Sequence, residues 1–278
     1  MIIDSHQHFW AYNERDYGWM RPARMALARD YLPSDLAPLL QANRVAGTVL
    51  VQARQVLEET DWCLDLAERH PFIQGVVGWV DLCSPRLEEQ LQRYTSRPKL
   101  KGVRHLLEDE PDDRFMLRPE FLRGIGLLGR YGLRYDIVIF PRHLPYAVEL
   151  ASRFPDQAFV LDHVAKPPIK SGQLSPWDRD LRRLAACTNV FCKLSGLVTE
   201  ADWRSWRPAE LRPYMEVVLD AFGPERLMFG SDWPVSTLAA PYEQVLGLVL
   251  DFIAPLPAAQ REAILAGNAR RFYGLAGS

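Results

Sequence analysis

The sequence predicts a (β/α)8 barrel that forms a single domain over residues 1–278. Two observations lead to this fold class. Eight short runs rich in Val, Ile, Leu and Phe recur along the chain, and each becomes polar at its carboxyl end. Segments with helical spacing separate these runs. Eight strands that alternate with helices over about 250 residues are typical of this barrel.

The eight apolar runs predict parallel strands. They are nearly continuous rather than alternating, as expected of strands whose two faces are both buried. The predicted strands are residues 2–8, 45–53, 72–82, 100–107, 134–140, 158–166, 190–196 and 227–235.

Helix signals occupy the intervening segments. Ser84-Pro85 and Ser175-Pro176 each read as an N-cap followed by proline at the first helical position. The spacing of apolar residues predicts four further helices, over 119–131, 143–153 and 209–222 and in the tail from residue 257. Gly132 is expected to end the first of them, and Pro213 is expected to kink or restart the third.

An open doubly wound sheet is the alternative fold. The first strand is not followed by the Gly-x-Gly-x-x-Gly turn that is typical of that fold when it binds dinucleotides. Residues 9–33 are too long for a tight turn, and we expect them to form a loop over the barrel mouth.

Composition narrows the function classes. The 33 basic and 35 acidic residues are well mixed and the net charge is −2, so we expect neither nucleic acid nor an anionic membrane as a partner. No apolar run is long enough to span a bilayer, and the N-terminus does not resemble a signal peptide. The four cysteines lack Cys-x-x-Cys spacing, which predicts free thiols in a reducing cytoplasm. Nothing in the sequence indicates an oligomeric state.

The first strand ends in Asp4-Ser5-His6-Gln7-His8. Side chains alternate along a strand, so His6 and His8 point the same way. Two imidazoles at one strand end can share a metal ion or a substrate.

Polar residues also follow the other strands, at the end of the barrel where reacting groups gather. Some of them could be structural instead of functional. Asp162 and Lys193 could be interior ions that pair with each other, and Asp4 could hold the backbone of a loop. His6, His8 and Asp232 together favour a functional site. The other polar residues at these ends are Gln52, Arg54, Arg104, His105, Arg142, His143, His163, Lys166, Ser195, Ser231 and Trp233.

Other catalytic signatures do not occur. The sequence lacks a Gly-x-Ser-x-Gly elbow, a Walker loop and a His-Glu-x-x-His pair. The remaining set of histidines and one aspartate around a barrel mouth is suited to a water, activated by a metal or a base, that attacks a carbonyl.

These motifs resemble the amidohydrolase superfamily, and within it the lactonases of sugar acids and of pyrone dicarboxylate. The resemblance spans nearly the whole chain in the right order. The matching segments are residues 4–8, 102–105, 141–145, 161–167, 193–196 and 229–234.

The resemblance implies a catalytic centre of His6, His8, His163 and Asp232, with Arg104 near the substrate carbonyl or its acid group. One divalent metal, with zinc as the best match, can bind through His6 and His8, with His163 and Asp232 as further candidates. Nitrogen and carboxylate donors suit this metal. The fourth strand ends in Arg104-His105 rather than in a bridging lysine or glutamate, which argues against two metals. Catalysis without metal stays open, because some lactonases that resemble this chain need none.

Three hypotheses follow. The first is hydrolysis of a sugar-acid lactone such as L-fuconolactone or L-rhamnonolactone, with Asp232 as general base. Either the metal, or His163 and Arg104, would stabilise the oxyanion. The second is a metal-dependent non-oxidative decarboxylase of an aromatic or enoic acid, and the third is a catalytically inactive binding barrel. For a small-molecule lactone, the predicted binding residues are Trp10, Arg54, Arg104, His105, Arg142 and Trp233.

Overall fold

The computed structural model describes residues 1–20 and 24–276. Eight parallel strands form one sheet in the order β1 to β8, so each strand pairs with its neighbour in sequence. The strands are β1 Ile2–Gln7, β2 Val45–Val51, β3 Ile73–Gly78, β4 Leu100–Leu106, β5 Arg134–Val138, β6 Phe159–Leu161, β7 Val190–Leu194 and β8 Leu227–Phe229.

The last strand returns to the first and closes the sheet. The N–H of Asp232 donates to the His6 carbonyl at 2.8 Å, and the N–H of His8 donates to the Trp233 carbonyl at 2.7 Å. The hydroxyl of Ser5 donates to the Phe229 carbonyl at 2.6 Å. The predicted (β/α)8 barrel is therefore confirmed, and an open sheet is excluded.

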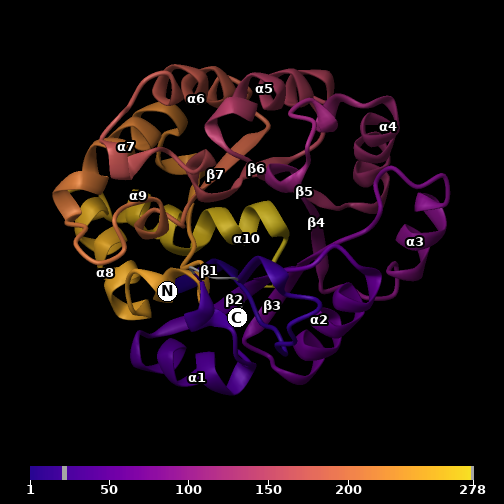
Figure 1. The fold of residues 1–278 in the computed structure, drawn as a ribbon, viewed down its shortest axis with the longest axis horizontal. Helices are drawn as coiled ribbons and strands as arrows, with labels where there is room; N and C mark the ends of the chain where they lie inside the picture. Colours follow the sequence, from indigo (N-terminus) through magenta and orange to yellow (C-terminus); the bar gives the residue numbers. More distant parts are fainter. Residues whose placement is uncertain (21–23, 277–278) are drawn as a thin grey trace.

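Helices surround the barrel (Figure 1). The C-terminal segment is the exception, since Figure 1 shows α10 inside the ring of helices. Phe272, Tyr273 and Leu275 pack there on Ile3 and Met228, which are barrel residues. The helices are α1 Pro33–Ala42, α2 Leu57–Arg69, α3 Leu87–Arg93, α4 Pro119–Leu128, α5 Leu144–Arg153, α6 Trp177–Ala185, α7 Pro208–Phe222, α8 Tyr242–Ile253, α9 Ala258–Glu262 and α10 Asn268–Tyr273.

Two helices begin later than predicted. The Ser84 hydroxyl accepts a hydrogen bond from the N–H of Arg86, and α3 starts at Leu87. The Ser175 hydroxyl donates to the Asp178 carboxylate, the Ser175–Pro176 bond is cis, and α6 starts at Trp177. Both serines therefore organise a turn before the helix.

Other helix predictions match the structure more closely. Gly132 is left-handed, with φ 67°, and follows the 3-10 turn Gly129–Tyr131 that ends α4. Pro213 is exposed and lies within α7, which continues from Pro208 to Phe222, so the helix does not restart there. The tail from 257 contains α9, a π-helical turn Ala263–Gly267 and α10.

The predicted strands extend too far at their carboxyl ends. The clearest cases are β6, which ends at Leu161, and β8, which ends at Phe229. The polar residues beyond these ends belong to turns, whose backbone can aim side chains inward in ways that a strand cannot.

The first loop contributes to the barrel mouth as predicted, since Trp10 and Arg24 line the cavity there. Trp10 and Tyr31 exchange backbone hydrogen bonds at 2.9 Å, and the indole N–H of Trp10 donates to the Arg29 carbonyl. Two 3-10 turns, Gly18–Met20 and Met25–Leu27, lie between them.

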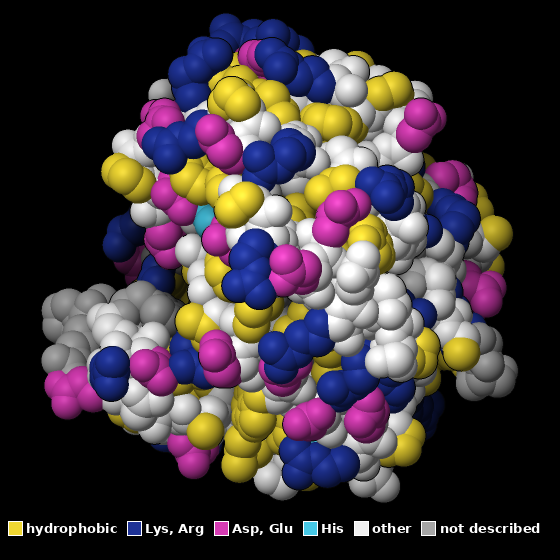
Figure 2. Space-filling view, turned by 90° about the vertical axis from the view of Figure 1, so that its right-hand side faces the viewer, with side chains coloured by type: hydrophobic (Ala, Val, Ile, Leu, Met, Phe, Trp, Pro, Cys, Tyr) yellow, Lys and Arg dark blue, Asp and Glu magenta, His cyan; other side chains and the backbone are white. Residues whose placement is uncertain are grey.

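The surface and cysteines agree with the composition. On the face shown in Figure 2, Lys and Arg side chains are interspersed with Asp and Glu. All four cysteines are free. Within the described part of the chain, no helix combines the length and apolar character needed to cross a membrane.

Candidate active site

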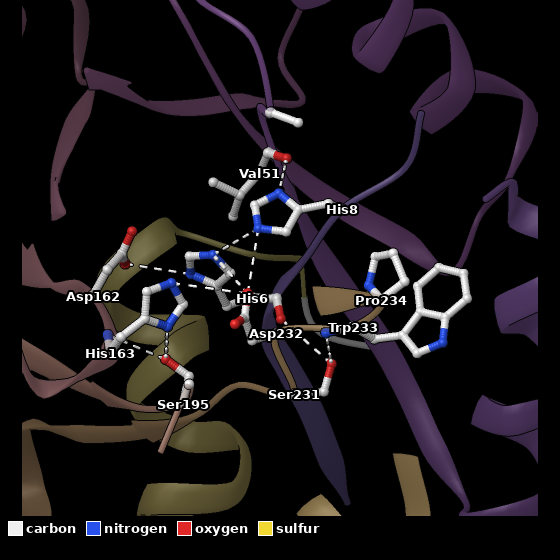
Figure 3. A network of polar contacts seen from close by, with 12 residues as sticks. His6, His8, Val51, Asp162, His163, Ser195, Ser231, Asp232, Trp233 and Pro234 are labelled. Carbon is white, nitrogen blue, oxygen red and sulfur yellow. Dashed lines mark hydrogen bonds and ion pairs between the residues drawn. The ribbon is translucent and has the colours of Figure 1, made fainter. Parts of the chain in front are cut away.

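Two histidines at the end of β1 lie side by side (Figure 3). The Nε2 atoms of His6 and His8 are 3.2 Å apart. Nδ1 of His8 is 2.7 Å from the carbonyl oxygen of Val51. Because a carbonyl only accepts, Nδ1 carries the proton of the neutral ring and Nε2 keeps its lone pair.

Asp232 faces this pair from the last strand. Its Oδ1 lies 3.5 Å from Nε2 of His8 and 3.9 Å from Nε2 of His6. Burial alone would raise the pKa of this carboxyl, but the surrounding imidazoles of His163, His8 and His6 hold it well below its ordinary value. Asp232 is therefore ionised at neutral pH.

His163 begins a left-handed turn. The φ angles of His163, Val164, Ala165 and Lys166 are 51°, 49°, 60° and 50°. Each such residue costs about 1–2 kcal/mol, so its surroundings must hold the turn in place. The indole N–H of Trp177 donates to the Val164 carbonyl at 2.8 Å. Strain of this kind clusters at functional sites.

The turn brings the His163 ring to Asp232. Nε2 of His163 is 3.8 Å from Oδ1 of Asp232, and Nδ1 is 2.9 Å from Oγ of Ser195. Gly196 makes room for the ring, because a Cβ atom there would lie 2.6 Å from Nδ1. Burial lowers the pKa of His163 to about 4, so the ring is neutral at neutral pH. A hydroxyl both donates and accepts, so Ser195 can support either tautomer.

A buried ionic network lies against His6. Nζ of Lys193 is 2.5 Å from Oδ2 of Asp136, 3.0 Å from Oδ1 of Asp162 and 3.1 Å from Nδ1 of His6. Nη1 of Arg104 is 3.0 Å from Oδ2 of Asp162 and 3.3 Å from Nε2 of His6. Burial alone would raise the pKa of Asp162, but Lys193, His6 and Arg104 hold it well below its usual range. Asp162 and Lys193 are thus paired interior ions.

The donor atoms fit one divalent ion. Ligand atoms of His6, His8 and Asp232 all lie within 4.8 Å of one another. Two imidazoles and a carboxylate leave a fourth tetrahedral position open, as in catalytic zinc sites. His6, Asp162 and His163 form a second such group. There, Lys193 and Arg104 already neutralise Asp162 and would repel a second cation.

The centre opens into a cavity of about 140 Å³. Four residues of the predicted catalytic set line it, together with side chains from the loops after β4, β6 and β7. Its lining includes His8, Trp10, Arg104, Glu108, Asp109, His163, Lys166, Thr199, Glu200, Trp203 and Asp232.

Two predicted binding arginines are held elsewhere. Arg54 makes ion pairs with Glu59 and Asp16, each at 2.6 Å. Arg142 is half-exposed and pairs with Asp113 at 2.9 Å. Neither is among the residues that line the cavity, because each has a carboxylate partner on a neighbouring segment.

His105 and Trp233 are also not among the residues that line the cavity. Nε2 of His105 is 2.6 Å from Oε1 of Glu110, and its ring stacks on Phe115. Trp233 packs edge-to-face against Phe9 and Tyr31. Of the predicted binding residues, Trp10 and Arg104 line the cavity.

Sequence reasoning missed several cavity residues. Lys166 stands among the polar residues predicted at the strand ends, but it is not among the predicted binding residues. Glu108, Glu200 and Trp203 lie in loops and short 3-10 turns, where no periodicity singles them out.

Comparison with known proteins decides the family. The sequence profile described as amidohydrolase matches residues 3–275. The chain belongs to the amidohydrolase family. Within it, an L-fucono-1,5-lactonase of Burkholderia multivorans is 45% identical over 98% of this chain and 96% of that protein. An L-fucono-1,5-lactonase of Burkholderia ambifaria is 43% identical over 86% of this chain and 82% of that protein.

A solved amidohydrolase structure is similar along the whole chain. This Burkholderia multivorans amidohydrolase with bound zinc has a TM-score of 0.96 and 44% identity, covering 99% of this chain and all of that one. The resemblance to amidohydrolases of the lactonase branch is confirmed.

Proposed function

We propose that this amidohydrolase opens the lactone ring of a sugar acid, with L-fucono-1,5-lactone as the first substrate to test. The ionised carboxylate of Asp232, held among three imidazoles at a cavity, carries the proposal. The similarity to L-fucono-1,5-lactonases supports the substrate class.

Asp232 acts as the general base. Its contacts with the three histidines are made through Oδ1, which leaves Oδ2 to accept a proton. As Oδ2 takes that proton from water, the water oxygen bonds to the lactone carbonyl carbon. The carbonyl π pair moves onto the carbonyl oxygen, which becomes an oxyanion.

His163 and Arg104 stabilise that oxyanion. A neutral His163 can donate from Nε2 while Nδ1 accepts from Ser195. The Arg104 guanidinium lines the same cavity. Such donors, already in place before the reaction, stabilise developing charge more than water does. Re-formation of the carbonyl breaks the bond to the ring oxygen, and Asp232 returns the proton there. The product is a hydroxy acid.

Zinc is the metal that we propose for the centre. Held by His6, His8 and Asp232, with His163 as a further candidate, it would act as a Lewis acid toward the carbonyl or the water. Without metal, His163 and Arg104 would polarise the carbonyl directly.

The decarboxylase alternative receives less support. Such an enzyme must neutralise a substrate carboxylate. Two of the cations that line the cavity, Arg104 and Lys166, are instead in ion pairs with Asp162 and Glu108.

Ring opening releases a proton at neutral pH, which gives a direct test. Purified protein is mixed with a panel of sugar lactones and a pH indicator, with and without a chelator. We expect enzyme-dependent acid release that exceeds spontaneous hydrolysis, with the highest kcat/KM on L-fucono-1,5-lactone or a lactone of the same ring configuration. Absence of acid release across the panel, together with CO2 release from aromatic acids, would favour the decarboxylase.

A further inference from the structure

We infer that Glu108, Glu200 and Lys166 form a hydroxyl-binding wall that selects uncharged polyhydroxy lactones and rejects lactones that carry a carboxylate. The inference rests on the proposed function and names its substrate class more narrowly.

The wall shares a cavity with the reaction centre. Glu108 lies in the 3-10 turn Leu107–Asp109 after β4, and Glu200 lies in the 3-10 turn Val198–Glu200 after β7. Both line the cavity that also contains Asp232 and His163. A substrate with its carbonyl at Asp232 therefore places its remaining atoms within reach of these carboxylates.

Lys166 is built into the same turn as His163. Its N–H donates to the His163 carbonyl at 2.7 Å, and its ammonium forms an ion pair with Glu108. The left-handed turn thus directs one side chain to the reaction centre and another to the wall. The same strained turn therefore positions residues of both the reaction centre and the wall.

The carboxyl of Glu200 stands apart from this pair. No hydrogen bond or ion pair joins it to another residue in the described parts of the chain, although it is mostly buried. A partly buried carboxylate that lines a cavity without a protein partner can accept hydrogen bonds from a ligand there. Burial raises the pKa of Glu200 to about 7, and the negative charges of Glu108 and Asp232 add to this effect.

These contacts favour hydroxyl groups over anions. A sugar hydroxyl can donate to a carboxylate, and such charge-assisted bonds are about twice as strong as neutral ones. A ligand carboxylate would instead meet the three carboxylates of Glu108, Asp109 and Glu200. Of the cations near them, Lys166 is paired with Glu108, and the charge of Arg24 acts on Asp109 and Glu200. Repulsion of this kind is a common source of specificity.

The experiment measures kcat/KM on three lactones. L-Galactonolactone carries a hydroxymethyl group where galactarolactone carries a carboxylate. The third lactone, δ-valerolactone, has no hydroxyl substituent. For the wild type we expect the order galactonolactone, δ-valerolactone, galactarolactone. Glu200→Ala should lower the galactonolactone-to-valerolactone ratio by about 10- to 100-fold, mainly through KM, because a hydrogen bond to a charged group is lost.

Glu108→Gln gives the sharper result. It leaves the Lys166 ammonium without its carboxylate, so galactarolactone should gain at least about 10-fold relative to galactonolactone, as expected for a new charge-assisted contact. Glu243→Gln, at an exposed position on α8, is the matched control and should leave both ratios unchanged. Misfolding would lower activity on all lactones together and would not move the ratios.

The outcomes separate the two proposals. If the wild type hydrolyses lactones but accepts galactarolactone as well as galactonolactone, or if both variants keep the wild-type ratios, the wall is refuted and the lactonase proposal stands. If the wild type hydrolyses no lactone, the proposed function itself fails.

Discussion

The backbone N–H of Asp232 donates to the carbonyl of His6, so the hydrogen bond that closes the barrel also joins two residues of its reaction centre. His8 forms the second closing bond, with the Trp233 carbonyl. The first and last strands therefore meet at the reaction centre. The backbone bonds that close the barrel also fix the positions of His6, His8 and Asp232.

Metal content is the first prediction. Protein purified without chelator should hold about one zinc per chain, because the second donor group is occupied by Lys193 and Arg104. His8→Ala should lower the zinc content measured by elemental analysis. His70→Ala changes a histidine at the end of α2 and should keep the zinc. Two zinc ions per chain would contradict this account.

Lys193 should be essential to stability. Lys193→Met leaves the carboxylates of Asp136 and Asp162 buried without their shared cation, which should cost about 3–5 kcal/mol. Lys170→Met removes an exposed ion pair with Asp202 and should cost at most about 1 kcal/mol. Urea unfolding measures both changes. Equal costs for the two variants would refute the buried network as a source of stability.

The left-handed turn should tolerate glycine. Ala165 has a φ of 60°, so Ala165→Gly removes a penalty of about 1–2 kcal/mol that offsets the entropic cost of glycine. Stability in urea should equal or exceed that of the wild type. Ala259→Gly, at an exposed position of α9, should instead cost about 0.5–1 kcal/mol. A similar loss at both positions would show that the turn is not strained.

Glu200 should make stability depend on pH. Burial raises its pKa from 4.5 to about 7, so the folded state binds more protons than the unfolded state between these values. The wild type should therefore lose stability relative to Glu200→Gln as pH rises from 4.5 to 7, by no more than about 3 kcal/mol. Urea unfolding of both proteins at pH 5 and pH 8 checks the sign. A wild type that gains stability relative to Glu200→Gln over this interval would contradict it.

Sequence patterns predicted the fold well because parallel strands are buried on both faces and leave continuous apolar runs. They also located His6, His8, His163 and Asp232 near one another, since the carboxyl ends of barrel strands converge. The same reasoning placed Arg54 and Arg142 near the mouth, but it does not show that Glu59 and Asp113 bind them. The turn from His163 to Lys166 contains no glycine, so nothing in the sequence signals its positive φ angles.

The most direct test of the account is the turnover of Asp232→Asn on the best sugar lactone. Asparagine accepts the left-handed backbone at this position, where φ is 56°, so the fold should be unchanged by circular dichroism and thermal unfolding. Loss of the general base should lower kcat by about 10²- to 10⁴-fold. Near-wild-type turnover in a folded, zinc-replete variant would contradict the claim that Asp232 moves the proton.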